Sequence, residues 1–225
     1  SSLVAKICAQ ELGDRALAVT ASSETYPRFE EEQARCVASQ IGIRHEVIRT
    51  SELAIAGFAD NPPERCYYCK RELFSKLVAI AQEEGLAMVA DGSNLDDASD
   101  FRPGARAAAA LGVRSPLREA GFTKADIREL SKELGLPTWD KPSFACLASR
   151  FPYGDRITQE ALGKVAAAEQ VLRDLGLRQL RVRHHRDLAR IEVPASELPT
   201  IISPDNRAHI VAEFRKLGYL YVTLD

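Results

Sequence analysis

The chain has 225 residues, 45% of them hydrophobic, so it is long enough to bury a core without disulfides or a structural metal. Its 30 basic and 32 acidic residues nearly cancel, which gives the whole molecule no attraction to nucleic acid or to an anionic membrane. No apolar run approaches the roughly 20 residues of a membrane span, no signal pattern opens the chain, and five cysteines do not form a secreted disulfide framework, so we expect a cytoplasmic protein.

The first two thirds of the sequence alternate helical and strand patterns. Apolar residues recur at helical spacing from residue 2 to residue 12, and Gly13 closes this opening helix. The next expected elements are a strand at 16–21, a helix at 30–41, a strand at 45–48, a helix at 70–84, a strand at 87–90 and a helix at 124–134. Such alternation is typical of a mainly parallel sheet covered by helices, a Rossmann-like sandwich.

The pattern changes after Gly154. Thr158 is suited to cap a helix that runs to about residue 175, strands are expected at 180–183, 188–193 and 220–224, and a helix is expected at 206–217. We therefore predict an α/β protein with a Rossmann-like domain at 1–150 and a smaller α+β domain at 151–225 that binds substrate or mediates oligomerisation.

Cys66 and Cys69 form a C-x-x-C pair at the expected entry to the helix at 70–84. The helix dipole and the neighbouring Arg65, Lys70 and Arg71 favour thiolates there, and two thiolates at this spacing can bind one metal ion or one cluster. The alternatives are a pair of partly buried structural cysteines or a thioredoxin-like dithiol, and the two intervening tyrosines and the position in the fold disfavour the dithiol.

Cys146 follows a helix stop, where parallel-sheet folds place functional loops, and a thiolate there would complete a three-cysteine set. Considered alone, it is equally well explained as a small buried hydrophobe. Cys8 and Cys36 lie on predicted helix faces beside apolar residues, so we expect both in the core. The four histidines share no metal-ligand spacing, although one of them could join the three cysteines in a closed, structural zinc site.

Two acidic residues, Asp91 and Asp97, begin and end the sequence DGSNLDD directly after the strand expected at 87–90. Ligands bind at the carboxyl ends of strands in parallel sheets, so these carboxylates are candidates for holding magnesium on a nucleotide. The alternative is an Asx-rich turn whose acids are solvated.

Arg181 and Arg183 project from the same face of one predicted strand, because side chains alternate with a period of two. Paired guanidinium groups can bind a phosphate, and the alternative is a solvated basic edge strand. Four more residues are candidates for this site: Ser149 and Arg150 for phosphate contacts, and Glu169 and Glu192 as acids.

Five blocks, in order along nearly the whole chain, resemble the LarE family of ATP-dependent sulfur transferases, which make the nickel-pincer nucleotide cofactor of lactate racemase. The blocks are TASSETYP, NPPERCYYCK, DGSNLDDASDFRPG, SPLREAGFTKADIRELSKELGLPTWDKPSFACLASRFPYG and RVRHHRDLARIEVP. One such block would be weak evidence, whereas five in order are specific.

The resemblance implies the PP-loop ATP pyrophosphatase (adenine nucleotide α-hydrolase) fold, whose first strand leads into an S-G-G-x-D-S-S loop that holds phosphates. Ser1 and Ser2 match the last two residues of that loop, so a chain that starts there is expected to lack the first strand and to bind ATP poorly. By the same resemblance, Ser22 lies beside the adenine, and Asp91 and Asp97 belong to the nucleotide site.

The activity that the resemblance implies is adenylation of a carboxylate of pyridinium-3,5-biscarboxylic acid mononucleotide by Mg-ATP, followed by displacement of AMP by sulfur. Some family members sacrifice a cysteine sulfur, and others bind a 4Fe-4S cluster through three cysteines. Cys66, Cys69 and Cys146 match the second type, which leaves one iron free to hold an exchangeable hydrosulfide. The substrate phosphate would contact Ser149, Arg150, Arg181 and Arg183, with Glu169 and Glu192 nearby.

The resemblance also implies a homo-oligomer. One alternative function is that of a tRNA-thiolating PP-loop enzyme, but such enzymes usually carry basic RNA-binding modules, which a net charge of −2 disfavours. Another alternative is a non-catalytic remnant with a zinc-stabilised fold, which metal analysis would distinguish from a cluster protein.

Overall fold

The computed structural model describes residues 1–99 and 103–225, which form two compact units. The first unit comprises residues 1–58 and 63–141, and the second comprises residues 59–62 and 142–225. Residues 142–150, which the sequence analysis assigned to the first domain, thus pack within the second unit. Residues 100–102 of the DGSNLDDASDFRPG block lie outside the described residues.

The short segment 59–62 is attached to the second unit by backbone and side-chain hydrogen bonds. Asn61 is fully buried in a left-handed conformation with φ 55°, and its Nδ2 donates to the carbonyl oxygen of Pro152 at 2.6 Å. The amide of Ile157 donates to the carbonyl oxygen of Ala59 at 2.8 Å. Asparagine adopts the left-handed region at a lower cost than most residues, which suits it to this position with positive φ.

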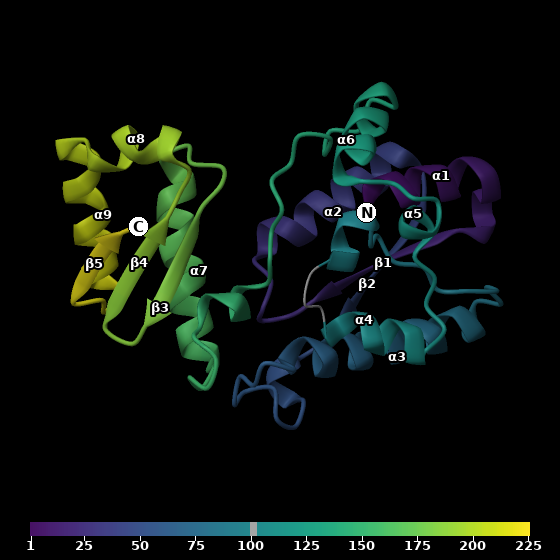
Figure 1. Ribbon diagram of the computed structural model, residues 1–225, viewed down its shortest axis with the longest axis horizontal. Helices are drawn as coiled ribbons and strands as arrows, with labels where there is room; N and C mark the ends of the chain where they lie inside the picture. The colour runs from purple at the N-terminus through teal and green to yellow at the C-terminus, as the bar shows by residue number, and fades with distance from the viewer. Residues whose placement is uncertain (100–102) are drawn as a thin grey trace. The chain divides into compact units, whose positions relative to one another are not determined.

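The first unit contains a parallel pair of strands, β1 (Leu17–Ser22) and β2 (Arg44–Arg49), in register along their full length. Helices α1 (Ser2–Leu12) and α2 (Arg28–Ile41) lie above these strands in Figure 1. Their apolar faces bury Ala16, Ala38 and Ile43. Gly42 ends α2 with φ 77°, a left-handed cap that glycine adopts without strain.

Below the strands in Figure 1 lie helices α3 (Arg65–Glu83) and α4 (Pro103–Ala110), which pack on each other around Phe74, Ala108 and Val113. Gly104 allows this approach, because a Cβ there would lie 2.8 Å from Cγ of Lys70. The helix predicted at 70–84 corresponds to α3 and begins five residues earlier than expected, at Arg65.

The strand predicted at 87–90 is wrong in extent. Only Ala90 pairs, in an isolated parallel bridge with Arg114. In a parallel pairing, residues 87–89 would lie opposite 111–113, but that segment forms the turn that ends α4, with the amides of Leu111 and Val113 donating to Ala107 and Ala108, so the ladder cannot extend over them. Helix α5 (Pro116–Glu119) begins directly after Ser115. Helix α6 (Lys124–Glu133) follows, opened by a capping box between Thr123 and Asp126.

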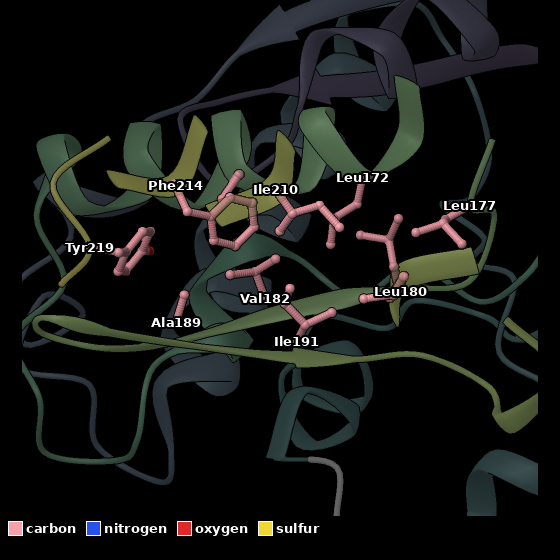
Figure 2. Close-up of a cluster of buried hydrophobic side chains, with 11 residues drawn as sticks. Leu172, Leu177, Leu180, Val182, Ala189, Ile191, Ile210, Phe214 and Tyr219 are labelled. Atoms are coloured by element: carbon pink, nitrogen blue, oxygen red, sulfur yellow. The ribbon is translucent and has the colours of Figure 1, made fainter. Parts of the chain in front are cut away.

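The second unit is a three-stranded sheet covered on one face by helices. The strands β3 (Arg181–His185), β4 (Leu188–Glu192) and β5 (Tyr221–Leu224) lie in that order, antiparallel between β3 and β4 and parallel between β4 and β5. Helices α7 (Gln159–Asp174), α8 (Leu198–Ile202) and α9 (Pro204–Lys216) complete the unit. Figure 2 shows its core, in which Val182 and Ile191 of the strands meet Leu172 and Phe214 of the helices.

Within the described residues, five short 3-10 helices connect these elements, at Gly13–Arg15, Glu52–Ala54, Leu95–Ser99, Leu147–Arg150 (η4) and Ala195–Glu197. The predicted fold class is confirmed: a parallel, helix-covered α/β unit is joined to a smaller α+β unit. No helix within the described residues is long and apolar enough to cross a bilayer.

Candidate functional site

The loop at 91–97 follows the Ala90–Arg114 bridge and is held by its own hydrogen bonds. Oδ1 of Asp91 accepts from the Ser93 amide at 3.1 Å and from the Ser115 hydroxyl at 2.8 Å, and Oδ2 accepts from the Ser93 hydroxyl at 2.7 Å. Asp97 accepts from the amide of Asn94 at 3.0 Å. Both predicted nucleotide-site acids therefore shape the loop that carries them.

This loop lies directly against the beginning of α1. A Cβ placed on Gly92 would lie 2.6 Å from both the Cβ and the backbone nitrogen of Ser1, so the position has no room for a side chain. Ser2, the first residue of α1, forms a hydroxyl–hydroxyl hydrogen bond of 2.5 Å with Thr138. The structure thus brings together Ser1, Ser2 and Asp91 at a helix N-terminus, where backbone amides and the helix dipole favour anions.

Ser22 is the last residue of β1, where its carbonyl oxygen accepts from the amide of Thr50 at 3.0 Å. A hydrogen bond from the Ser22 hydroxyl, followed by one from Arg35, lowers the pKa of Glu31. Ser22 therefore lies at a strand's carboxyl end in the same unit as the loop at 91–97, and its place in a nucleotide site stays a prediction.

The cysteine pair lies inside the first turns of α3 rather than before the helix. Cys66 is exposed and Cys69 is half-buried, and neither is in a disulfide. Residues three apart on a helix share a face, so the two thiols can serve one ligand. Cys146 is half-buried at the N-cap of η4, in the second unit, and is likewise in no disulfide.

Cys66 and Cys69 belong to the first unit and Cys146 to the second, and the three-cysteine set stays a prediction. Within residues 1–99 and 103–225, no three His, Cys, Asp or Glu side chains gather as a group that could hold a metal ion. The expectation that Cys36 is in the core is wrong: it lies on the solvent side of α2. Cys8 is half-buried and packs against the cluster around Ala38, and this burial raises the pKa of its thiol.

Basic side chains surround the cysteine-bearing turns. The guanidinium carbons of Arg71 and Arg106 lie 5.7 and 5.5 Å from the centroid of the Tyr67 ring, and Nζ of Lys70 lies 5.3 Å from that of Phe74. These contacts hold positive charge on the helical turns that carry Cys66 and Cys69.

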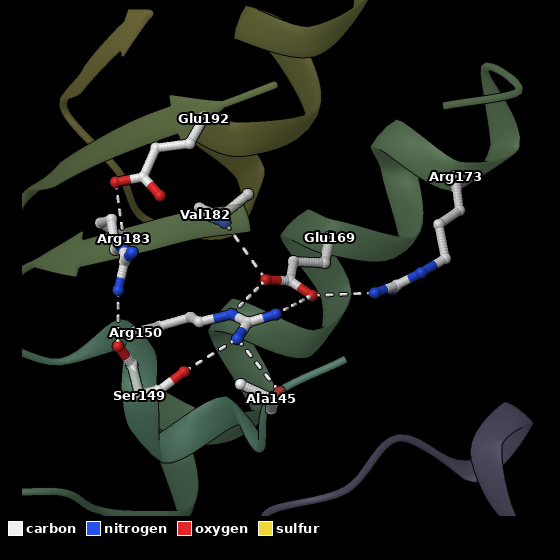
Figure 3. A network of polar contacts seen from close by, with 8 residues as sticks. All are labelled: Ala145, Ser149, Arg150, Glu169, Arg173, Val182, Arg183 and Glu192. Atoms are coloured by element: carbon white, nitrogen blue, oxygen red, sulfur yellow. Dashed lines mark hydrogen bonds and ion pairs between the residues drawn. The ribbon is translucent and has the colours of Figure 1, made fainter. Parts of the chain in front are cut away.

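In the second unit, a buried ion pair connects the loop after Cys146 to α7 (Figure 3). Nε of Arg150 donates to Oε1 of Glu169 at 2.7 Å, and the two side chains are 1% and 0% exposed. Glu169 also accepts from Arg173 at 2.8 Å and from the amide of Val182 at 3.2 Å. Its charge is therefore satisfied by two cations and a strand amide.

The same network positions Ser149. NH1 of Arg150 donates to the Ser149 hydroxyl at 2.9 Å, and NH1 of Arg183 donates to the Ser149 carbonyl oxygen at 2.8 Å (Figure 3). Oε1 of Glu192 accepts from Nε of Arg183 at 2.8 Å and from NH2 of Arg190 at 3.0 Å. Burial opposes ionisation of Glu192, but these two guanidinium groups outweigh it and lower its pKa.

Arg181 differs from its neighbours, because it is exposed and makes no ion pair within the part of the chain that the structure describes. Partial burial of its guanidinium group, followed by repulsion from Arg150 and Arg183, lowers the pKa of Arg181. Positive charge thus accumulates around Ser149 on one side of the β3–β4 pair. An anion is the ligand that this surplus favours.

The structure brings together the six predicted phosphate-site residues of the second unit and, separately, Ser1, Ser2 and Asp91 of the first. Three residues that shape or border the loop at 91–97 were not among the predicted site residues: Ser115, Gly92 and Asn94. No sequence signal indicated Ser115, whereas the glycine inside DGSN could have indicated a close backbone approach.

No family model matches the chain. It is 46% identical over 225 residues to an uncharacterized protein of Synechocystis sp., a match that covers 100% of this chain and 84% of that protein. It is 38% identical over 226 residues to the pyridinium-3,5-bisthiocarboxylic acid mononucleotide synthase of Lactiplantibacillus plantarum, covering 100% of this chain and 81% of that protein. A tRNA-specific 2-thiouridylase of Azorhizobium caulinodans is 33% identical over 138 residues, covering 48% of this chain and 35% of that protein.

Proposed function

Because the chain belongs to the LarE family of ATP-dependent sulfur transferases, we propose that it converts a carboxylate of pyridinium-3,5-biscarboxylic acid mononucleotide into a thiocarboxylate, for the nickel-pincer nucleotide cofactor. The observation that carries this proposal is the 38% identity to the Lactiplantibacillus plantarum synthase along the entire chain. The 33% identity to a 2-thiouridylase over 138 residues is in keeping with ATP-dependent sulfur transfer.

The reaction has two steps. In the first, an oxygen of the substrate carboxylate attacks the α-phosphorus of ATP, and pyrophosphate leaves with the electron pair of the broken P–O bond. In the second, hydrosulfide attacks the carbonyl carbon of the acyl-adenylate, AMP leaves, and the proton of the hydrosulfide passes to solvent. The product is a thiocarboxylate, and the first step is needed because a carboxylate is a poor electrophile.

For the nucleotide, we assign Ser1, Ser2 and Ser22 as contacts at the start of α1 and the end of β1, and Asp91 and Asp97 as acids of the neighbouring loop. The amides at the beginning of α1 would bind phosphate oxygens. Mg²⁺ bound with ATP would neutralise phosphate charge, with the acids of the loop adding to the negative field that holds it.

For the substrate phosphate, the exposed Arg181 and the half-buried Arg183 are the direct contacts, together with the hydroxyl of Ser149. Arg150 and Glu169 are fully buried and bonded to each other, so their role is to hold Ser149 and strand β3 in place. Glu192 orients Arg183 in the same way.

For the sulfur, the proposed donor set is three cysteines that are in no disulfide, and soft thiolates are the ligands that iron–sulfur clusters require. Cys66, Cys69 and Cys146 would hold a 4Fe-4S cluster, which would supply an exchangeable hydrosulfide when bound. Lys70, Arg71 and Arg106 carry positive charge around the turns that present the first two cysteines, which suits an anionic cluster. We place the reaction in the cytoplasm, in a homo-oligomer that binds neither nucleic acid nor membrane.

The test is turnover by the full-length protein under anaerobic conditions. After anaerobic reconstitution, incubation with Mg-ATP, the dicarboxylate mononucleotide and sulfide should release AMP and pyrophosphate in step with thiocarboxylate, which mass spectrometry identifies. Release of AMP and pyrophosphate without sulfur in the product would contradict sulfur transfer. Thiolation of tRNA in place of the mononucleotide would assign the chain to the tRNA-modifying branch, and one zinc per chain without iron or sulfide would indicate a structural metal.

A further inference from the structure

Asn94 is a buried polar residue whose side-chain oxygen has no partner. The residue is 8% exposed, and its Oδ1 accepts no hydrogen bond from any residue that the structure describes. Its backbone is fully engaged, because the amide donates to Asp97 at 3.0 Å and the carbonyl oxygen accepts from the amide of Asp97 at 3.3 Å. The Oδ1 atom is thus held in a fixed loop with its bonding capacity unused.

An unsatisfied buried acceptor lowers stability by about 1–3 kcal/mol, and more than 90% of buried polar groups avoid this cost by pairing. Hydrogen bonds and one close packing contact fix the conformation of the loop. Asp91 accepts three hydrogen bonds, Leu95 donates its amide to the carbonyl oxygen of Phe122 at 2.8 Å, and Gly92 packs against Ser1. An acceptor left open in such a rigid loop is typical of a ligand site.

The surroundings of Asn94 decide which ligand suits it. The carboxylates of Asp91 and Asp97 make the loop negative, and Nζ of Lys124 lies 3.9 Å from Oδ1 of Asp97. The N-terminus of α1, which favours phosphate, lies directly against Gly92. A neutral oxygen in a loop that carries two carboxylates and packs against such a helix end suits a hard divalent cation or the water bound to one.

We propose that Oδ1 of Asn94 is an oxygen ligand, directly or through one water, of the magnesium ion that accompanies ATP. This inference rests on the proposed function, and it identifies a residue that neither the C-x-x-C pair nor the acidic residues of the loop would have indicated. Mg²⁺ usually takes only one or two protein oxygens and completes its shell with phosphates and water, so a set of three protein ligands is not required.

The first test measures the stability of the free protein. Asn94→Leu replaces the unpaired oxygen with an apolar side chain, so thermal unfolding of the full-length protein without nucleotide should shift upward by about 2–4 °C. Asn206→Leu is the matched control in the second unit, because Nδ2 of Asn206 donates to the carbonyl oxygen of Thr200 at 2.8 Å and its removal should shift the midpoint downward. A midpoint lowered by Asn94→Leu as much as by the control would overturn the claim that Asn94 is kept for a ligand.

The second test measures binding of α,β-methylene ATP by calorimetry, with excess magnesium and with EDTA. In Asn94→Leu, the factor by which magnesium tightens binding should fall about tenfold or more, while binding in EDTA stays within about twofold of wild type. Asn94→Asp, which retains an oxygen ligand, should keep the magnesium dependence, and Asn206→Leu should behave as wild type.

The outcomes separate this inference from the proposed function. If wild-type protein fails to bind the analogue with magnesium, the proposed ATP-dependent activity itself is wrong. If wild type binds and Asn94→Leu keeps the full magnesium dependence, Asn94 is not a metal ligand. If Asn94→Leu lost the same factor of affinity for the analogue in magnesium and in EDTA, Asn94 would contact the nucleotide rather than the metal, and the assignment would likewise be overturned.

Discussion

Arg150 and Glu169 form an ion pair from which water is excluded, with Nε 2.7 Å from Oε1 and both side chains at most 1% exposed. The pair joins η4 to α7, and through the amide of Val182 it reaches β3. Three elements that carry predicted phosphate-site residues are therefore positioned by one carboxylate. In the proposed phosphate site, the pair would act on the substrate through Ser149 and Arg183 rather than by contact.

Removing either charge should destabilise the protein strongly. Glu169→Gln leaves Arg150 buried without a counter-charge, and Arg150→Met leaves the buried carboxylate with Arg173 and the Val182 amide, so each should lower the free energy of unfolding by about 3–5 kcal/mol. The double variant should cost less than the sum of the two, since it leaves no lone charge. Urea unfolding measures all three, and single losses under about 1 kcal/mol would mean that the pair behaves like a surface salt bridge.

Arg181 and Arg183 should separate substrate binding from stability. Arg181 is exposed and unpaired within the described residues, so Arg181→Gln should raise KM for the mononucleotide about tenfold or more while the free energy of unfolding changes by less than about 0.5 kcal/mol. Arg183→Gln should raise KM and also destabilise, because it breaks the bonds to Glu192 and Ser149.

A dephosphorylated form of the substrate supplies the control for this pair of variants. Wild type should convert this dephosphorylated form with a low kcat/KM, and Arg181→Gln should not lower that kcat/KM further. A KM for the intact mononucleotide that Arg181→Gln leaves unchanged would remove Arg181 from the phosphate site.

Local signals in the sequence predicted most of the fold. The opening helix was predicted at 2–12 and is found at Ser2–Leu12, because its apolar spacing and Gly13 are properties of adjacent residues. Thr158 was predicted to cap a helix, and its hydroxyl accepts from the amide of Ala161 at 3.1 Å. The strand predicted at 87–90 is wrong in extent, because its length depends on a parallel partner at 111–113, and that segment forms the turn that ends α4.

The site was less predictable, because its parts meet only after folding. Arg181 and Arg183 follow from strand periodicity, but the burial of Arg150 with Glu169 depends on α7 packing beside η4, which no local pattern encodes. The unpaired oxygen of Asn94 likewise arises only in the folded loop, and no local sequence pattern indicates it. Cys66 and Cys69 could be found from spacing alone, whereas adding Cys146 required the resemblance to a family.

Iron binding should depend on three cysteines and be indifferent to the other two. After anaerobic reconstitution of the full-length protein, Cys66→Ser, Cys69→Ser and Cys146→Ser should each lose most of the iron and sulfide and the broad visible absorption of a cluster. Cys36→Ser is the matched control, since this thiol is exposed on α2 and belongs to no predicted site.

Sulfur transfer should fall with the iron content in the three variants and persist in Cys36→Ser. If Cys146→Ser kept wild-type iron while Cys66→Ser and Cys69→Ser lost it, the three-cysteine set would be wrong and the C-x-x-C pair would bind metal without it. If all three cysteine variants bound as much iron as wild type, the proposal of a cysteine-bound cluster would be wrong.

His184 should make the second unit lose stability as the pH falls below neutrality. Its Nδ1 lies 3.0 Å from the hydroxyl of Tyr219, and Nζ of Lys164 lies 3.8 Å from the centroid of the Tyr219 ring. Burial, followed by repulsion from Lys164 and His185, lowers the pKa of His184 below its usual 6.5, although Asp155 and Asp187 act in the opposite direction.

The sign of the pH effect follows from linkage. The unfolded chain binds a proton at this histidine more readily than the folded chain, so the contribution of neutral His184 is complete above about pH 6.5 and is lost as the pH falls towards the folded pKa. Urea unfolding between about pH 7.5 and pH 5.5 should show wild type losing more stability than His184→Gln, which has no proton to bind. The exposed His209→Gln should follow wild type. Parallel curves for wild type and His184→Gln would show that the burial of His184 does not couple its protonation to folding.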